Sequence, residues 1–445
     1  MFDEARSMFG KWRQAHQDAR DRAELDRFVA DCGALLGEPG ESNSAAIAAR
    51  ALERWGRLPA AERVRFFEVL ATGMDPDPEE VLALARRWAE DRSPATLVSL
   101  QRAAEPPRQE LLRRLNRAPG GAGTIVRMRA ELLERLRGAP ELAAVDADFL
   151  HLLGSWFNPG FLELRRIDWD SPARLLEQII RHEAVHEIDG WNDLRRRLQP
   201  DRRCFAFFHP ILPDEPLIFV EVALLPQMPA AIAPLIAPAS EPLSSERFRV
   251  AAFYSISNCQ PGLRGVNLGN FLIKRVAEAL RLEFPKLSTF CTLSPVPSFS
   301  AWLAKTGPLR SDRVKPERLA VLDGQLAAWR ADPRAGVDAS AVRAVSASKE
   351  PSDAAAPLLE RLAAFYLMHT RADEASGSDP VARFHLGNGA RLERINVAAD
   401  GSLKGQRQSR GVMVNYLYDL DEVEANHERF VRGEVRASRA VAQLP

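Results

Sequence analysis

Cysteine is scarce in this chain and follows no ligand or disulfide pattern. Its four cysteines (Cys32, Cys204, Cys259 and Cys291) lie far apart, and none belongs to a CxxC pair. This spacing argues against both a disulfide framework and a thiolate zinc site. A reducing compartment is the simpler interpretation.

An excess of charge is also absent. Lys and Arg together number 60, Asp and Glu together number 60, and the formal net charge is zero. A nucleic-acid-binding protein needs a basic excess to neutralise phosphates. We therefore expect no nucleic-acid partner.

Long uninterrupted apolar runs and targeting patterns are missing as well. The longest apolar stretch, residues 216–238, contains Glu221 and several prolines, which disfavours a membrane span. Residues 1–28 mix acids with bases and have no apolar signal core. The last residues, VAQLP, carry no peroxisomal tripeptide. These features predict a cytoplasmic protein without a membrane partner.

The first third of the chain has a helical pattern. The 445 residues, 46% hydrophobic and 27% charged, suit a globular protein of two or three domains. Apolar residues recur at spacings of three and four in 60–72, 78–90 and 125–136. Asp75, Asp77 and Ser93 precede helical runs as N-caps. Residues 1–156 are therefore predicted to form an all-helical N-terminal domain that serves packing and oligomerisation.

From residue 157 to 445 strands and helices are mixed. Helices are expected over 173–198 and 267–282, and a loop over 332–357. The expected strands are 161–169, 204–208, 217–224, 250–257, 288–293, 390–397 and 411–417. An α+β or α/β domain follows from this order.

A glycine-containing loop stands between the expected strand 250–257 and the helix after it. Gly262, Gly265 and Gly269 leave backbone N–H groups free to meet a phosphate at a helix entrance. The loop is neither a Walker loop nor a dinucleotide fingerprint. Arg264-Gly-Val-Asn-Leu-Gly269 resembles the [QR]xxGxG/A loop of the GNAT fold, which binds the pyrophosphate of coenzyme A, although Asn267 replaces the first glycine. A structural turn is the alternative.

His182-Glu183-Ala-Val-His186 matches HExxH, the pattern of a zinc hydrolase in which two histidines share one helix face. Asp189 stands where the metzincin extension requires glycine, and no third histidine follows. The histidines can equally flank a core-facing apolar stripe.

Two further positions suit catalysis. Ser294 follows a strand within a turn that contains two prolines, although Ser294 or Ser298 can equally be a helix N-cap. His385 stands just before a glycine-rich turn, where it can be a proton donor or a structural histidine.

Taken together, these segments resemble the malonyl-CoA decarboxylase family. The matching stretches are RRCFAFFHPILPDEPLIFVEVAL (202–224), FYSISNCQPGLRGVNLGNFLIKRV (253–276), TLSPVPSF (292–299), FHLGNGARLERIN (384–396) and GVMVNYLY (411–418). The resemblance implies a helical oligomerisation domain followed by a GNAT-like catalytic domain. It also implies conversion of malonyl-CoA to acetyl-CoA and CO₂ without metal, biotin or pyridoxal phosphate.

The resemblance assigns roles to individual residues. It places the catalytic serine at Ser294 and the catalytic histidine at His385. The acyl-CoA loop becomes Arg264, Gly265, Val266, Asn267, Leu268, Gly269 and Asn270, and Tyr418 is a candidate for the pocket wall. A homo-oligomer, dimer or tetramer, is expected through the helical domain. An N-acyltransferase, a zinc hydrolase and a non-enzymatic acyl-CoA sensor are the alternatives.

Overall fold

The computed structural model of the chain divides into two compact units. It describes residues 2–266, 268, 272–331, 355–370 and 379–445. The first unit contains Met1–Leu162, His209–Pro213 and Gln260–Leu268. The second contains Glu163–Phe208, Asp214–Cys259 and Gly269–Pro445.

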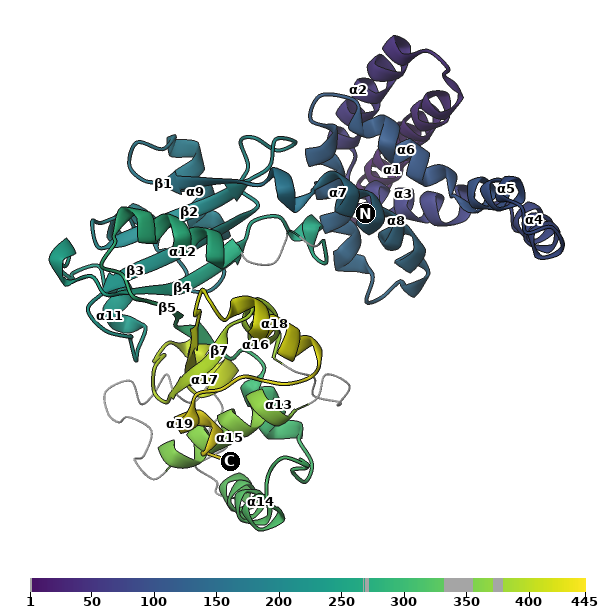
Figure 1. Ribbon diagram of the computed structural model, residues 1–445. Helices are drawn as coiled ribbons and strands as arrows, with labels where there is room; N and C mark the ends of the chain where they lie inside the picture. Colours follow the sequence, from purple (N-terminus) through teal and green to yellow (C-terminus); the bar gives the residue numbers. More distant parts are fainter. Residues whose placement is uncertain (1, 267, 269–271, 332–354, 371–378) are drawn as a thin grey trace. The chain divides into compact units, whose positions relative to one another are not determined.

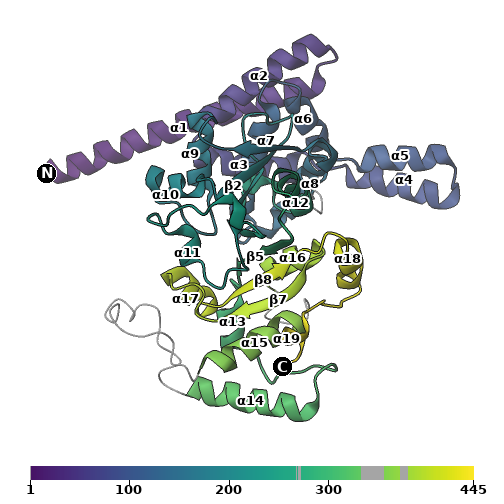
Figure 2. The ribbon, with the colours of Figure 1, turned by 60° about the vertical axis from the view of Figure 1, so that its left-hand side comes forward.

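The first unit is helical. Its elements are α1 (Phe2–Gly37), α2 (Glu41–Arg57), α3 (Ala60–Gly73), α4 (Pro78–Glu90), α5 (Pro94–Ala104), α6 (Pro107–Asn116), α7 (Gly121–Arg135), η1 (Pro140–Leu142), α8 (Ala143–Trp156), η2 (Pro159–Phe161) and η4 (Pro261–Leu263). Aromatic rings of α1, α2 and α3 pack edge to face at its core, with the centroids of Phe28 and Phe66 4.7 Å apart. The three helices expected from apolar periodicity are confirmed, and Asp77 and Ser93 cap α4 and α5 as expected. The cap expected at Asp75 is wrong, because its carboxylate accepts a hydrogen bond from Arg108 Nη1 and α4 begins after Asp77. The α4–α5 hairpin extends away from the other helices of this unit (Figures 1 and 2).

The second unit is built on a mixed sheet. Its strands are β1 (Glu163–Ile167), β2 (Arg202–Phe208), β3 (Ile218–Leu225), β4 (Val250–Asn258), β5 (Thr289–Thr292), β6 (Ser294–Pro295), β7 (Arg391–Asn396) and β8 (Met413–Leu417). The sheet order is β1-β2-β3-β4-β5-β8-β6, and β7 pairs with β8. The strands predicted from alternating and β-branched residues are therefore confirmed.

Helices accompany this sheet throughout the second unit (Figure 1). They are α9 (Ala173–His182), α10 (Gly190–Arg197), α11 (Ala233–Ile236), η3 (Ser245–Arg247), α12 (Leu272–Glu283), α13 (Phe299–Lys305), α14 (Pro316–Ala331), α15 (Ala356–His369), α16 (Pro380–Gly387), α17 (Leu403–Ser409), α18 (Val423–Val431) and α19 (Arg439–Ala442). β4 and β5 are parallel neighbours, and α12 lies between them in the chain. The α+β class with a helical N-terminal part is confirmed.

The continuous helix expected over 173–198 is wrong. α9 ends at His182, residues 183–189 are irregular, and α10 begins at Gly190 with a positive φ of 73°. Glu183 accepts hydrogen bonds from the backbone N–H groups of Val185 (2.8 Å) and His186 (2.7 Å). These bonds compete with continuation of the helix.

Parts of two other expected segments lie outside the described residues. Of the helix expected over 267–282, the described part is α12, which begins at Leu272; Asn267, Gly269 and Asn270 are not described. Residues 332–354 of the expected loop also lie outside the described chain. No helix among the described residues is long and apolar enough to cross a membrane.

Candidate active site

Ser294 lies in β6, at one end of the strand order of the second unit's sheet. It begins β6, directly after β5, and pairs with Val414 of β8. Its side chain is buried. Pro295 and Pro297 follow within the turn to α13, and each fixes its own φ, so the backbone around Ser294 has little freedom. Ser294 is therefore a strand residue, and the N-cap position of α13 belongs to Ser298, whose side chain makes no cap hydrogen bond.

His385 reaches Ser294 from a short helix. α16 begins after Asp379, with Pro380 in its first turn, and its hydrophobic residues Ala382 and Leu386 are buried beside His385. The Nε2 atom of His385 lies 2.9 Å from Ser294 Oγ. The two residues to which the resemblance assigns catalysis are 91 positions apart in the sequence and are in contact in the fold.

Two tyrosines complete the surroundings of the imidazole. Tyr418 OH lies 2.9 Å from His385 Nδ1. The Tyr416 ring stacks on the imidazole, with centroids 4.7 Å apart and planes 25° apart. Tyr418 is among the residues expected from sequence and Tyr416 is not, although the period of two along a strand places both on one face.

Burial sets the protonation of this cluster. Desolvation lowers the pKa of His385 to about 3, so the imidazole is neutral near pH 7. Desolvation also raises the pKa of Tyr418, which therefore keeps its O–H. With the proton of the neutral imidazole on Nε2, Tyr418 donates to Nδ1 and Nε2–H donates to Ser294 Oγ. The hydroxyl hydrogen of Ser294 is then free to point at a ligand.

The described part of the glycine loop belongs to the first unit and is anchored to α7. Arg129 Nη1 donates to the carbonyl oxygens of Gly262 (2.8 Å) and Arg264 (2.7 Å), and Asp146 holds the Arg129 Nε at 2.8 Å. Gly265 has a φ of +84°, which glycine adopts without strain. Arg264 and Gly265 are exposed, Val266 is half-buried and Leu268 is buried.

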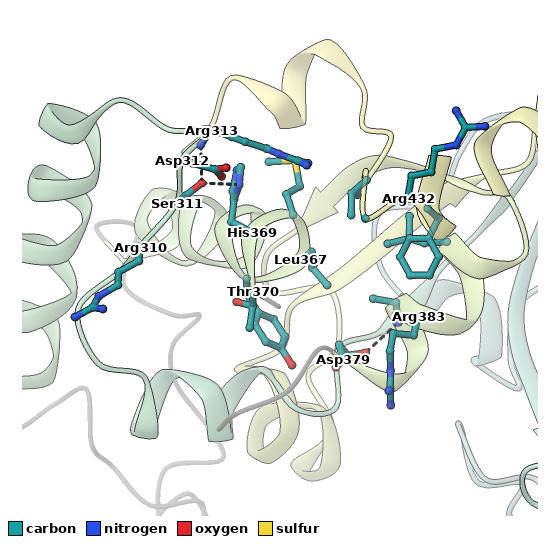
Figure 3. Close-up of a pocket in the computed structure, with 17 residues that line it drawn as sticks. Arg310, Ser311, Asp312, Arg313, Leu367, His369, Thr370, Asp379, Arg383 and Arg432 are labelled. Carbon is teal, nitrogen blue, oxygen red and sulfur yellow. Dashed lines mark hydrogen bonds between the residues drawn. The ribbon is translucent and has the colours of Figure 1, made fainter. Parts of the chain in front are cut away.

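The second unit also contains cavities outside the Ser294–His385 contact. One of about 1080 Å³ is lined by residues of α15, α16 and the segments around residues 310–313 and 430–435, among them His369, Asp379 and Arg383 (Figure 3). Neither Ser294 nor His385 is among its described lining residues. A smaller cavity of about 310 Å³ is lined by Tyr418 together with residues of β5 and its approach.

The comparisons with known proteins agree over nearly the whole chain. The family model "Malonyl-CoA decarboxylase C-terminal domain" matches residues 160–444, and "Malonyl-CoA decarboxylase N-terminal domain" matches residues 74–157. This chain belongs to the malonyl-CoA decarboxylase family.

Individual members of the family are similar over most of their length. The mitochondrial malonyl-CoA decarboxylase of Rattus norvegicus is 35% identical over 412 residues, which cover 87% of this chain and 83% of the rat protein. The crystal structure of malonyl-CoA decarboxylase from Rhodopseudomonas palustris has a TM-score of 0.83 and 45% identity, covering 94% of this chain and 99% of that one. The Agrobacterium vitis structure has a TM-score of 0.79 and 48% identity with the same coverage.

In this member of the malonyl-CoA decarboxylase family, the HExxH stretch does not have the geometry of a zinc site. Because α9 ends at His182, the two histidines do not lie one turn apart on a helix. The Glu183 carboxylate is occupied by backbone N–H groups and by Ser255 Oγ at 2.6 Å. Within the described ranges, no three His, Cys, Asp or Glu side chains are grouped so as to hold a metal ion. Glu183 therefore anchors the 183–189 segment to β4.

Proposed function

We propose that this chain decarboxylates malonyl-CoA to acetyl-CoA and CO₂, with Ser294 and His385 as its catalytic residues. The observation that carries the assignment is the buried Ser294–His385–Tyr418 hydrogen-bond chain, with both contacts at 2.9 Å, in a member of this family. The substrate is that of the family, and the contacts of Ser294 and His385 support the roles proposed for them.

The reaction needs charge stabilisation and one proton. Breaking the bond between the α-carbon and the carboxylate releases CO₂ and leaves the electron pair on the α-carbon, delocalised onto the thioester oxygen as an enolate. Hydrogen-bond donors aimed at that oxygen stabilise the charge as it develops. A proton then bonds to the α-carbon to give acetyl-CoA. Since the thioester is the electron sink, the proposed mechanism uses no metal, biotin or pyridoxal phosphate.

His385 supplies this proton in the proposed mechanism. Because burial disfavours the imidazolium, Nδ1 takes the Tyr418 proton as the ring gives up the Nε2 proton. The negative charge of the enolate then ends on the Tyr418 oxygen. The enolate carbon is a stronger base than a tyrosinate, so it drives this transfer against the raised pKa of Tyr418. The proton reaches the α-carbon from Nε2 directly or through Ser294 Oγ. Ser294 also orients the substrate carboxylate out of the thioester plane, which aligns the breaking bond with the π system. Solvent returns a proton to the Ser294–His385–Tyr418 hydrogen-bond chain after each turnover.

The coenzyme A pyrophosphate is assigned to the loop Arg264, Gly265, Val266, Asn267, Leu268, Gly269 and Asn270. Three features support this assignment: the exposed Arg264, the bare backbone of Gly265 and the anchoring of the loop by Arg129. Backbone N–H groups with a nearby guanidinium are suited to phosphate oxygens.

A second copy of the chain is the proposed macromolecular partner, bound through the helical unit. The α4–α5 hairpin exposes Leu82 (45%), Leu97 (37%) and Val98 (43%), apolar surface that association would cover. Light scattering is expected to give the mass of a dimer or tetramer. The mass of one chain at micromolar concentration would contradict this part of the proposal.

A cytoplasmic location is proposed from the four free, buried cysteines, which suit a reducing compartment. Fractionation of the native host tests it. Recovery of the protein in an organelle or at a membrane would overturn it.

Single-residue variants test the catalytic assignment. Ser294→Ala and His385→Ala should each lower kcat by about 10²–10⁴, the usual contribution of a proton-transfer group. Ser93→Ala, which removes the N-cap of α5 in the other unit, is the matched control and should leave kcat unchanged. A His385→Ala protein with near-full turnover would remove His385 from the mechanism.

A further inference from the structure

Asp379 stands at the beginning of the helix that carries His385. It is 2% exposed, and its Oδ1 accepts hydrogen bonds from the backbone N–H groups of Val381 (2.9 Å) and Ala382 (3.1 Å). These bonds satisfy N–H groups that have no partner within the first turn of a helix. One oxygen is sufficient for this task.

The other oxygen of the same carboxylate leaves the helix and binds the segment that follows Ser294. Asp379 Oδ2 accepts a hydrogen bond from Ser298 N at 3.0 Å. Ser298 is four residues after Ser294, and Pro295 and Pro297 stiffen the backbone between them. A bond that holds Ser298 therefore also restrains Ser294.

Other helices of this chain show that capping alone does not require such a carboxylate. α5, α17 and α19 are capped by Ser93, Ser402 and Ser438, each with a single oxygen. Asp77 caps α4 by accepting from Glu79 N at 3.0 Å, at a position that is not buried. A buried carboxylate is costly unless its oxygens are hydrogen-bonded. The second bond gives a reason for aspartate at residue 379.

We propose that Asp379 is a positioning residue that ties α16 to the Ser294 turn and so holds Ser294 Oγ and His385 Nε2 in contact. The inference rests on the proposed function, because it requires Ser294 and His385 to be the reacting pair. Figure 3 shows Asp379 just before α16, with Arg383 one turn further on, at the edge of the 1080 Å³ cavity. Asp379 touches neither catalytic side chain in this arrangement and acts through the two elements that carry them.

Two substitutions distinguish the hydrogen bond from Ser298 N to Asp379 from the N-cap hydrogen bonds of Asp379. Asp379→Asn keeps one acceptor oxygen and converts the other into an amide donor, so it can retain the cap or the bond to Ser298 but not both. Asp379→Ala loses both. Since a misplacement of about 1 Å costs about 10²-fold in rate, we expect kcat to fall about 10-fold for Asn and about 10²-fold for Ala. KM for malonyl-CoA should stay within about twofold, because no group that binds the coenzyme is altered.

Asp77→Ala is the matched control, since Asp77 is also an aspartate N-cap followed by proline but lies in the first unit. It should leave kcat unchanged. A general loss of folded protein would instead appear as a lower melting temperature and a lower active fraction, so kcat is referred to folded protein by a thermal melt.

A double-mutant cycle identifies what Asp379 acts through. In the His385→Ala background, Asp379→Ala should lower the residual rate by less than about threefold, because the side chain that it positions is gone. A further 10²-fold loss in that background, or a single Asp379→Ala variant with unchanged kcat, overturns the inference while His385→Ala remains defective. If His385→Ala itself keeps full turnover, the proposed function fails and the inference fails with it.

Discussion

Lowering the pH from about 8 to about 5 should leave kcat/KM for malonyl-CoA nearly constant, because His385 stays neutral over that range. Its pKa is lowered by burial from an ordinary 6.5 to about 3. The pH dependence of kcat/KM reports the pKa values of the free enzyme. The neutral imidazole is the form that accepts from Tyr418 and donates to Ser294.

The size of the effect follows from these two values. An imidazole with a pKa of 6.5 is about 3% neutral at pH 5, and kcat/KM would then fall about 30-fold. With a pKa of about 3, the imidazole is about 99% neutral at the same pH, and the change is below about twofold. A mechanism that needs the imidazolium in the free enzyme would instead give about a tenfold rise for each pH unit of acidification.

The assay is a series of initial rates in constant-ionic-strength buffers, with protein stability checked at each pH. Tyr416→Ala is the informative variant, because it removes the ring stacked on His385 and admits water. Its kcat/KM should develop an acid limb as the pKa of His385 returns toward 6.5. An acid limb near pH 6.5 in the wild type would refute the reasoning.

The remaining predictions concern the same residues and the loop. The pKa of His385 is lower in the folded than in the unfolded protein, so its contribution to stability is complete above pH 6.5 and is lost as the pH falls toward 3, by about 1.4 kcal/mol per pH unit. In urea titrations, His385→Gln should therefore lose less stability than wild type between about pH 6.5 and 5. Equal losses in the two proteins would contradict a neutral buried imidazole. Arg264→Ala should raise KM with little change in kcat if its side chain meets phosphate, and an unchanged KM counts against that contact. Arg129→Met removes the hydrogen bonds to two loop carbonyls and should likewise raise KM by about tenfold, corresponding to about 1.4 kcal/mol of lost binding; tight substrate binding in this variant would show that the anchor is dispensable. Chelator should not lower the decarboxylase activity of Glu183→Gln or of wild type. Inhibition of the wild type by chelator would revive the zinc alternative.

Local patterns predicted the elements better than they predicted the contacts between them. The strands β2 to β5 and the helices α3, α4 and α7 follow from apolar periodicity and cap residues, which act within a few positions of the chain. The break after α9 could not be predicted from local patterns. The apolar pattern continues through Val185 and Ile188, whereas the Glu183 carboxylate bonds to Ser255, a partner 72 residues away.

The candidate site shows the same division. Pattern alone favoured a cap at Ser294 or Ser298, and the resemblance to the family pointed to Ser294 and His385. Their 2.9 Å contact depends on tertiary packing of β6, β8 and α16, which no local spacing specifies. Asp379 before Pro380 could be recognised as a cap from sequence, but its second bond to Ser298 could not. Tyr416 and Tyr418 could have been paired from strand alternation, although not placed against His385.

The most direct test of the account is to incubate the purified, chelator-treated full chain with malonyl-CoA and follow the products by mass. Wild-type protein should form acetyl-CoA, and Ser294→Ala and His385→Ala should lose this activity almost completely. Intact malonyl-CoA after incubation with folded wild-type protein would contradict the account. Transfer of an acetyl group from acetyl-CoA to an added amine would then favour an N-acyltransferase, and binding of malonyl-CoA without turnover would favour a sensor.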